Sequence, residues 1–232
     1  MIETKLILIE GLPGSGKSTT AHKLAALLTD GGLSCRYFLE WDPDNPISIG
    51  DEAHLAEVVA SSIAREDEVL QQWRALAQAG AAAETITILE SRFWQTTLML
   101  MYAAGRSAEA LLASNRQVIG AIRDLKPALI YFAVDDPKAF FRRTIEIKNE
   151  EWRRAGQSVA WVDHVFSAFA GQQRFVEGGL AGLEGGLQFM ADWATVAEAL
   201  YDQTPFPKVK LRNPHHDWSL AMADIQTFLE LA

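Results

Sequence analysis

The chain has 232 residues, of which 49% are hydrophobic, and it carries a net charge of −9 and a single cysteine, Cys35. This acidic balance argues against broad nucleic-acid binding, which needs a positive surface. The single cysteine excludes an internal disulfide, no apolar run is long enough to span a membrane, and the charged N-terminus is unlike a secretory signal. We therefore expect a cytoplasmic protein with no nucleic-acid and no membrane partner.

The hydrophobic pattern predicts strands and helices that alternate along the chain. In chain order we expect a strand at 5–11, a helix at 15–29, a strand at 34–40, two helical stretches within 51–80, a strand at 85–90, helices at 95–104 and 107–124, a strand at 128–134, helices at 138–154 and 158–176, a short strand at 209–211 and a helix at 218–231. The glycine-rich residues 177–187 predict a flexible connector. This alternation favours a single α/β domain over residues 1–232, with a parallel sheet covered by helices on both faces.

Residues 11–18 read GLPGSGKS and fit the phosphate-binding pattern G-x-x-x-x-G-K-[ST]. The loop lies between an expected strand and an expected helix, where the helix N-terminus adds its positive end. Its glycines let the backbone approach an anion, Lys17 reaches the β- and γ-phosphates, and the Ser18 hydroxyl is the ligand for Mg²⁺. The predicted nucleotide-binding residues are Pro13, Gly14, Ser15, Gly16, Lys17, Ser18 and Thr19.

Residues 51–54 spell Asp-Glu-Ala-His, the letters of a helicase box. They follow NPISIG rather than an apolar strand, and the chain is too short for two motor domains. We interpret them instead as the start of a helix, with Asp51 near the N-cap and Glu52 in the first turn.

Acidic residues follow the second and third expected strands. Residues 39–43 read LEWDP, so either Glu40 or Asp42 closes the second strand, and Glu90 ends the third. Because the carboxyl ends of neighbouring parallel strands open onto one crevice, we expect these carboxylates to converge beside the glycine loop. The loop and these acids together resemble the small P-loop kinases, especially the thymidylate kinases and deoxynucleoside kinases.

The resemblance implies a three-layer P-loop NTPase fold with a five-stranded parallel sheet of order 2-3-1-4-5 and a helical lid or insert. It also implies that Glu40 or Asp42 lies over the acceptor hydroxyl and acts as the base, with Glu90 in support. Residues 89–93 read LESRF and resemble the Asp-Arg-Tyr or Glu-Arg-Ser of those kinases, with the arginine displaced by one position. Arg92 is therefore a candidate catalytic residue.

A second arginine comes from the fourth-strand exit. Residues 134–137 read VDDP, and with Arg143 beyond them they resemble the strand exit and the lid helix of thymidylate kinases. The resemblance implies a lid over residues 138–158 whose Arg143 closes over the transferring phosphate. A charged, solvent-exposed helix with pairs such as Glu150–Arg154 is the alternative interpretation of this segment.

The predicted function is ATP- and Mg²⁺-dependent transfer of a γ-phosphoryl group to a small-molecule hydroxyl or phosphate. This chemistry needs positioning and positive charge around the migrating group. The expected partners are a nucleotide and a nucleoside- or nucleotide-like acceptor, and similar kinases are often homodimers. Two alternatives stay open: phosphorylation of an antibiotic or other natural product on the same fold, and a nucleotide-dependent switch or binding protein with slow hydrolysis.

The chain has 7 tryptophans. Core packing explains any one of them, but several fall in segments that are expected to rim the crevice. A group of tryptophans beside one cleft predicts an acceptor with a flat or apolar body. The tryptophans in question are Trp41, Trp94, Trp152 and Trp161.

Overall fold

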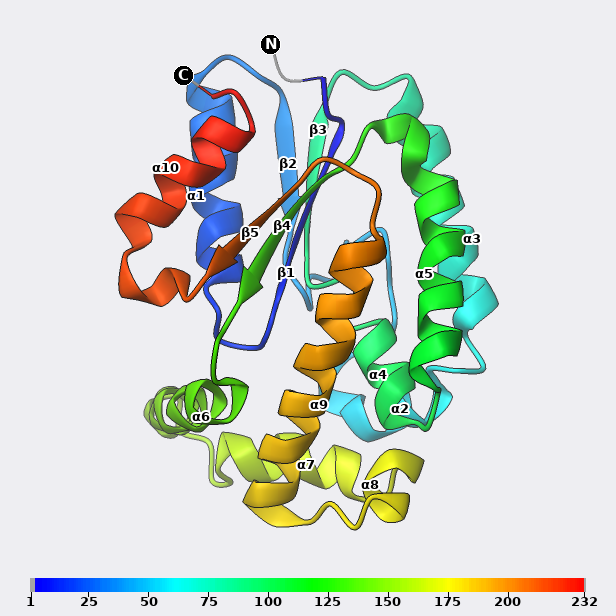
Figure 1. Cartoon of the computed structure of the whole chain (residues 1–232), viewed down its shortest axis with the longest axis vertical. Helices are drawn as coiled ribbons and strands as arrows, with labels where there is room; N and C mark the ends of the chain where they lie inside the picture. The colour runs from blue at the N-terminus through cyan, green and yellow to red at the C-terminus, as the bar shows by residue number, and fades with distance from the viewer. Residues whose placement is uncertain (1–2, 232) are drawn as a thin grey trace.

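The computed structural model describes residues 3–231, and a parallel sheet forms its centre (Figure 1). The five strands lie in the order β2-β3-β1-β4-β5, and every neighbouring pair is parallel. This arrangement confirms the predicted three-layer fold and strand order. The strands are β1 (Leu6–Gly11), β2 (Cys35–Phe38), β3 (Ile86–Glu90), β4 (Ala128–Ala133) and β5 (Lys208–Arg212).

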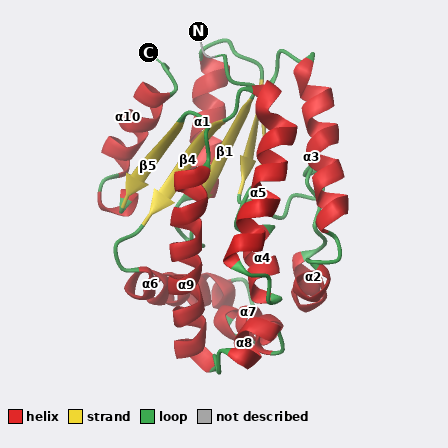
Figure 2. Ribbon diagram, turned by 45° about the vertical axis from the view of Figure 1, so that its right-hand side comes forward, coloured by secondary structure: helices red, strands yellow, loops and turns green. Residues whose placement is uncertain are grey.

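Helices connect the strands and cover both faces of the sheet (Figure 2). The α-helices are α1 (Lys17–Asp30), α2 (Leu55–Ser61), α3 (Glu66–Ala81), α4 (Leu98–Ala103), α5 (Ala108–Ile122), α6 (Pro137–Arg154), α7 (Trp161–Ala170), α8 (Gln173–Glu177), α9 (Gly182–Gln203) and α10 (Trp218–Phe228). A short 3₁₀ turn, Glu52–His54, precedes α2, and the Asp51 side chain caps it by accepting from the Ala53 N–H at 2.9 Å. Asp51 and Glu52 therefore begin a helical segment, as predicted.

The sheet has an apolar layer on each face because β1, β3 and β4 are buried on both sides. On one face Ile7 and Ile9 pack against α1 and α10 through residues such as Leu24 and Ile225. On the other face Leu6 and Leu8 belong to a larger core that includes side chains of α3, α5 and α9. Figure 1 shows α1 and α10 on one side of the sheet and α3 and α5 on the other.

A smaller helical layer lies beyond the carboxyl ends of the strands. Helices α6, α7 and α8 lie there, and α9 runs from this layer back along the sheet (Figures 1 and 2). Helix α6 packs against both α7 and α9. This layer and the strand ends face one another, so the fold places a cleft where the sequence predicts the crevice.

The structure differs from the expected elements at several points. Helix α1 begins at Lys17 rather than at residue 15, and the helix expected over 158–176 is divided into α7 and α8 at Gly171. Residues 182–187, expected within the connector, form the first turns of α9. Gly186 is buried against Phe166 of α7, and a Cβ at Gly186 would overlap that ring. Here glycine allows two helices to pack closely, and this tertiary contact overrides its low helix propensity.

Candidate active site

The glycine loop connects β1 to α1 in a shape that its glycines permit. Gly14 has φ +81° and Gly16 has φ +91°, both in the left-handed region that favours glycine. A Cβ at Gly14 would overlap Thr144 of α6, and a Cβ at Gly16 would overlap the ring of Trp218 on α10. The loop is therefore held between two helices that lie far from it in the sequence.

The loop forms one wall of a cleft of about 690 Å³. Ser15 is the exception among the predicted nucleotide-binding residues, because its side chain is buried and does not line the cleft. Its backbone N–H donates to the Leu12 carbonyl at 3.1 Å, so it closes the loop on itself. The loop residues that line the cleft are Pro13, Gly14, Gly16, Lys17, Ser18 and Thr19.

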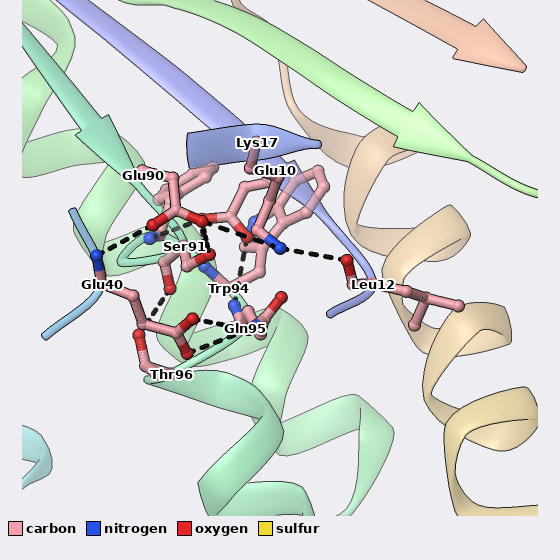
Figure 3. Close-up of polar contacts among 10 residues, drawn as sticks. Glu10, Leu12, Lys17, Glu40, Glu90, Ser91, Trp94, Gln95 and Thr96 are labelled. Atoms are coloured by element: carbon pink, nitrogen blue, oxygen red, sulfur yellow. Dashed lines mark hydrogen bonds and ion pairs between the residues drawn. The ribbon is translucent and has the colours of Figure 1, made fainter. Parts of the chain in front are cut away.

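Lys17 is held in the floor of this cleft, where its side chain is 4% exposed. Its Nζ donates to the Leu12 carbonyl at 3.0 Å and lies 3.7 Å from Glu90 Oε1 (Figure 3). A buried ammonium group needs such partners, since an unpaired one would carry a large desolvation cost. The loop thus presents one fixed positive charge to the cleft.

Glu90 ends β3 in the same floor and is 2% exposed. Its Oε1 accepts from the Ser91 hydroxyl at 2.6 Å, and its Oε2 accepts from the Glu40 N–H at 2.8 Å. Ser91 has φ +63°, a conformation that is uncommon for a residue with a side chain and that turns the chain sharply at the strand end. Glu90 therefore links Lys17 of the loop to the end of β2.

Glu40 follows β2 and lines the cleft beside Glu90. The Gln95 amide Nε2 donates to both of its carboxylate oxygens, at 2.9 and 3.0 Å (Figure 3). Burial, and after it the negative charge of Glu90, raises the pKa of Glu40 to about 8, while Lys17 and Arg92 oppose this shift. Such a carboxyl group exchanges its proton near neutral pH, as a general base should.

The structure distinguishes Glu40 from Asp42, which the sequence left as alternatives. Asp42 does not line the cleft, and its Oδ2 accepts from the Leu39 N–H at 2.7 Å. This bond closes the turn after β2, which the Asn45 amide also stabilises by donating to the Leu39 carbonyl at 2.9 Å. Asp42 is thus used in the turn that presents Glu40.

Glu10, one residue before the loop, is a further carboxylate of this cluster and is buried. Its two oxygens accept from the backbone N–H groups of Phe93, Trp94 and Gln95 at 2.8, 3.0 and 3.1 Å (Figure 3). Burial raises the pKa of Glu10 to about 7, against the opposing effects of these donors and of Lys17. The contact joins β1 to the turn after β3 and so fixes the position of Gln95.

Arg92 lies in the same cluster but does not line the cleft. It is 1% exposed, and its guanidinium carbon lies 5.5 Å from the ring centre of Trp41. Burial lowers the pKa of Arg92, while the surrounding carboxylates of Glu40 and Glu90 oppose that effect. Arg92 therefore lies near the site, as predicted, but outside the cleft lining. From there its positive charge offsets the negative charges of Glu40 and Glu90.

Arg143 is on α6 but is exposed and does not line the cleft. It lies close enough to His215 to lower the pKa of that ring, behind the effects of burial and His216. The cation of α6 that lines the cleft is Lys148, which pairs with Glu151 at 2.8 Å. Helical geometry explains the difference, since residues 143 and 148 project from different faces of α6.

The far wall of the cleft is apolar and aromatic. Three of the four tryptophans expected at the rim, Trp41, Trp152 and Trp161, do line it. Trp94 does not, because it turns into the core, where its indole N–H donates to Asn115 Oδ1 at 3.1 Å. The prediction for Trp94 is therefore wrong: the sharp turn at Ser91 directs this side chain inward.

Sequence reasoning missed several residues that line the cleft, namely Glu52, Gln95, Thr96 and Lys148. Gln95 and Thr96 lie in the turn between Glu90 and α4, which carries no motif of its own. Glu52 belongs to the stretch that resembles a helicase box, and its cleft position depends on how α2 packs beneath α7. Within residues 3–231, no group of three or more His, Cys, Asp and Glu side chains is arranged to hold a metal ion by itself.

Across residues 3–231, no helix has the length and apolar character that crossing a bilayer requires.

No protein-family model matches the sequence, and no curated protein matches it. Solved structures do match: a deoxyadenosine kinase from M. mycoides with bound dATP is similar over 95% of this chain and 98% of its own, with a TM-score of 0.50 and 16% sequence identity. At this identity the similarity shows the fold alone, a P-loop fold like that of the deoxyadenosine kinase.

Proposed function

We propose that this protein is a phosphotransferase that moves the γ-phosphoryl group of ATP to a small-molecule acceptor. The observation that carries the proposal is the shared cleft, which both Lys17 of the phosphate loop and Glu40 line, with Glu90 between them: its carboxylate lies 3.7 Å from Lys17 Nζ and accepts from the Glu40 backbone N–H at 2.8 Å. A phosphate-binding cation and a base with a raised pKa on one cleft floor are the two parts that phosphoryl transfer needs. The kinase with this fold supports the same assignment.

On the donor side, the loop holds the nucleotide phosphates. Gly14 and Gly16 pack against Thr144 and Trp218, where no Cβ would fit, so the loop backbone is held in one shape, and Lys17 supplies positive charge at the floor of the cleft. Ser18 is exposed at the start of α1 and lines the cleft, as Glu90 does, so its hydroxyl would suit Mg²⁺. When bound, Mg²⁺ neutralises charge on the β- and γ-phosphates.

On the acceptor side, Glu40 takes the proton of the attacking hydroxyl. Gln95 orients its carboxylate, and Arg92 stabilises the ionised form from behind. The segment 138–158 acts as the lid, because α6 covers the loop through Thr144 and carries Lys148 into the cleft. Lys148 is the lid cation that lines the cleft, whereas Arg143 is exposed on another face of α6.

The experiment is ADP release from Mg·ATP by the purified protein. It is run alone and with a panel of nucleosides, nucleoside monophosphates, sugars and hydroxylated natural products, with Lys17→Ala as the blank. We expect at least one acceptor to raise turnover a hundredfold or more, and Lys17→Ala to abolish that gain. A flat panel together with intact ATP binding would overturn the proposal in favour of a switch that needs a protein partner.

A further inference from the structure

The half of the cleft farther from the loop has a continuous apolar and aromatic wall. It is contributed by α4, α6, α7 and α9, and the rings of Trp161 and Phe141 meet edge to face at 6.1 Å within it. Such a wall stabilises a ligand in proportion to the apolar area that the ligand removes from water. The lining residues with apolar surface still exposed include Trp41, Ile147, Trp152, Trp161 and Val165, and the buried side chains of Met99, Phe141, Phe169 and Met190 support them.

The charges that line the cleft oppose a second anion beside the nucleotide. Both lining cations among the described residues already lie against carboxylates, Lys17 against Glu90 at 3.7 Å and Lys148 against Glu151 at 2.8 Å. Two further lining carboxylates, Glu40 and Glu52, have no lining lysine of their own. A phosphate acceptor needs cations that are not committed elsewhere, because its charge would otherwise face these acids.

The arginines of α6 do not change this balance. Arg142 pairs with Glu184 at 2.8 Å, and Arg153 and Arg154 both pair with Glu150 at 2.8 Å, all on exposed surface. Arg143 is exposed on the side of α6 near His215. None of the four lines the cleft.

The side chain of Gln95 indicates, independently of the charges, which hydrogen-bonding group the ligand should carry. The side chain lines the cleft and is 3% exposed, and its Nε2 is committed to Glu40. Its Oε1 is buried without a hydrogen-bond partner. A buried amide oxygen without a donor is costly, so this atom calls for a donor group on whatever fills the cleft.

We propose that the acceptor is an uncharged or cationic compound with an aromatic or similarly apolar body, which carries its reactive hydroxyl beside a second hydrogen-bond donor. The hydroxyl lies on Glu40, the neighbouring O–H or N–H donates to Gln95 Oε1, and the body packs on the apolar wall. This inference rests on the proposed phosphotransfer. In that step the acceptor proton passes to Glu40, the acceptor oxygen bonds to the γ-phosphorus, and the bond from phosphorus to the β-phosphate oxygen breaks to release ADP.

The test is a calorimetric titration in which the loop is first filled with Mg²⁺ and the non-hydrolysable β,γ-imido analogue of ATP. Probes with one shared body isolate the charge: 3-(1-naphthyloxy)-1,2-propanediol is neutral, propranolol is a cationic amino alcohol, and 1-naphthyl phosphate is an anion. Thymidine and thymidine monophosphate make a second matched pair. We expect the diol and propranolol to bind at least tenfold more tightly than 1-naphthyl phosphate, and the diol at least a hundredfold more tightly than glycerol.

Variants identify the atoms involved. Gln95→Met keeps the side-chain length but removes the acceptor, and it should weaken the diol at least fivefold. Ile147 lines the cleft yet is 50% exposed, so Ile147→Asp should fold and weaken both naphthyl ligands about tenfold. Val176→Asp, at a residue 65% exposed on α8 and outside the cleft lining, is the matched control and should change nothing.

The inference is overturned if either phosphate binds as tightly as its uncharged partner, or if Ile147→Asp and Val176→Asp behave alike. These titrations involve no turnover, so they separate the inference from the proposed function. ADP release stimulated by thymidine monophosphate but by no neutral or cationic aromatic alcohol would leave the phosphotransferase standing and remove this acceptor class. If the ligands bind in the expected order but no acceptor stimulates ADP release, the proposed phosphotransferase activity is contradicted and the inference about the ligand stands.

Discussion

The two walls of the cleft are built in different ways. The donor wall comes from two short segments, residues 13–19 and the strand-end residues around Glu90, and its contacts are polar and hydrogen-bonded. The acceptor wall comes from side chains of separate helices, from Leu55 to Met190, and most of it is apolar. In the proposed reaction a phosphate would be held largely by backbone groups and one lysine, whereas an organic acceptor would be held by the shape of the side chains. Changes on the two walls should therefore have different consequences.

The largest expected effect is on the donor wall. Lys17→Ala removes the charge that faces the phosphates, and we expect turnover to fall by about a thousandfold, the order seen when a preorganised charge-stabilising group is lost. Acceptor binding should persist, since the apolar wall is untouched. The measurement is ADP release together with calorimetry. Lys23→Ala, at an exposed lysine of the same helix, is the control and should retain activity.

The next effect is at the boundary of the two walls. Glu40→Gln keeps the contact with Gln95 but cannot accept a proton, so turnover should fall by roughly a hundredfold or more while the affinity for Mg·ATP holds. Rapid-quench measurement of the first turnover would show whether the chemical step is the one affected. Glu57→Gln, on the exposed face of α2, serves as the matched substitution. Equal loss in both variants would remove Glu40 from its role as base.

A substitution at Glu10 tests the buried hydrogen bonds that join β1 to the turn after β3. Glu10→Gln places an amide NH₂ where one carboxylate oxygen now accepts, so one backbone donor loses its partner, and unfolding free energy should fall by roughly 1–3 kcal/mol. The wild-type pKa is raised to about 7, so the stability contributed by this group is present at pH 4 and is lost as pH rises through 7. The difference between variant and wild type in urea unfolding should therefore be larger at pH 5.5 than at pH 8.5. A difference that does not change with pH would contradict this assignment.

The smallest effect is a displacement of the pH profile. Arg92 lowers the pKa of Glu40, so Arg92→Met should raise that pKa and move the rising limb of kcat/KM to higher pH. Arg92→Lys keeps the charge and should leave the limb closer to its wild-type position. A purely structural role would lower activity at every pH without moving the limb, and would show Arg92 to be outside the electrostatics of the base.

Much of the donor wall could be predicted from the sequence. The spacing of Gly11, Gly16 and Lys17 after an apolar strand determines a phosphate loop, because successive backbone N–H groups and one lysine act over a few residues. Glu90 was predictable for the same reason, as an acid at the end of a buried strand beside β1. Ser15 is the one predicted loop residue that does not line the cleft, and its N–H bonds to the Leu12 carbonyl.

The acceptor wall could not be predicted to the same degree. Helix α6 has a charged sequence whose arginines attract attention, yet its packing against α7 and α9 presents Lys148 to the cleft and leaves Arg143 exposed. Glycines at 185 and 186 suggested a flexible connector, but both belong to α9, where Gly185 packs on Leu180 and Gly186 on Phe166. The position of each of these residues depends on which face of its helix packs against a helix far away in the sequence.

The sequence by itself predicted the strands and helices, the phosphate-loop motif and the acids at the strand ends, because each follows from periodicity and spacing within a short segment. The strand order was an expectation from the resemblance to P-loop kinases, and the structure confirms it. The tertiary structure placed Glu40 in the cleft lining and Asp42 outside it, packed Trp94 in the core, and brought Gln95, Lys148 and the aromatic wall to one cleft. The physical reason is distance along the chain. A loop that binds through its own backbone carries its geometry locally, whereas a wall of side chains exists only after separate helices have packed.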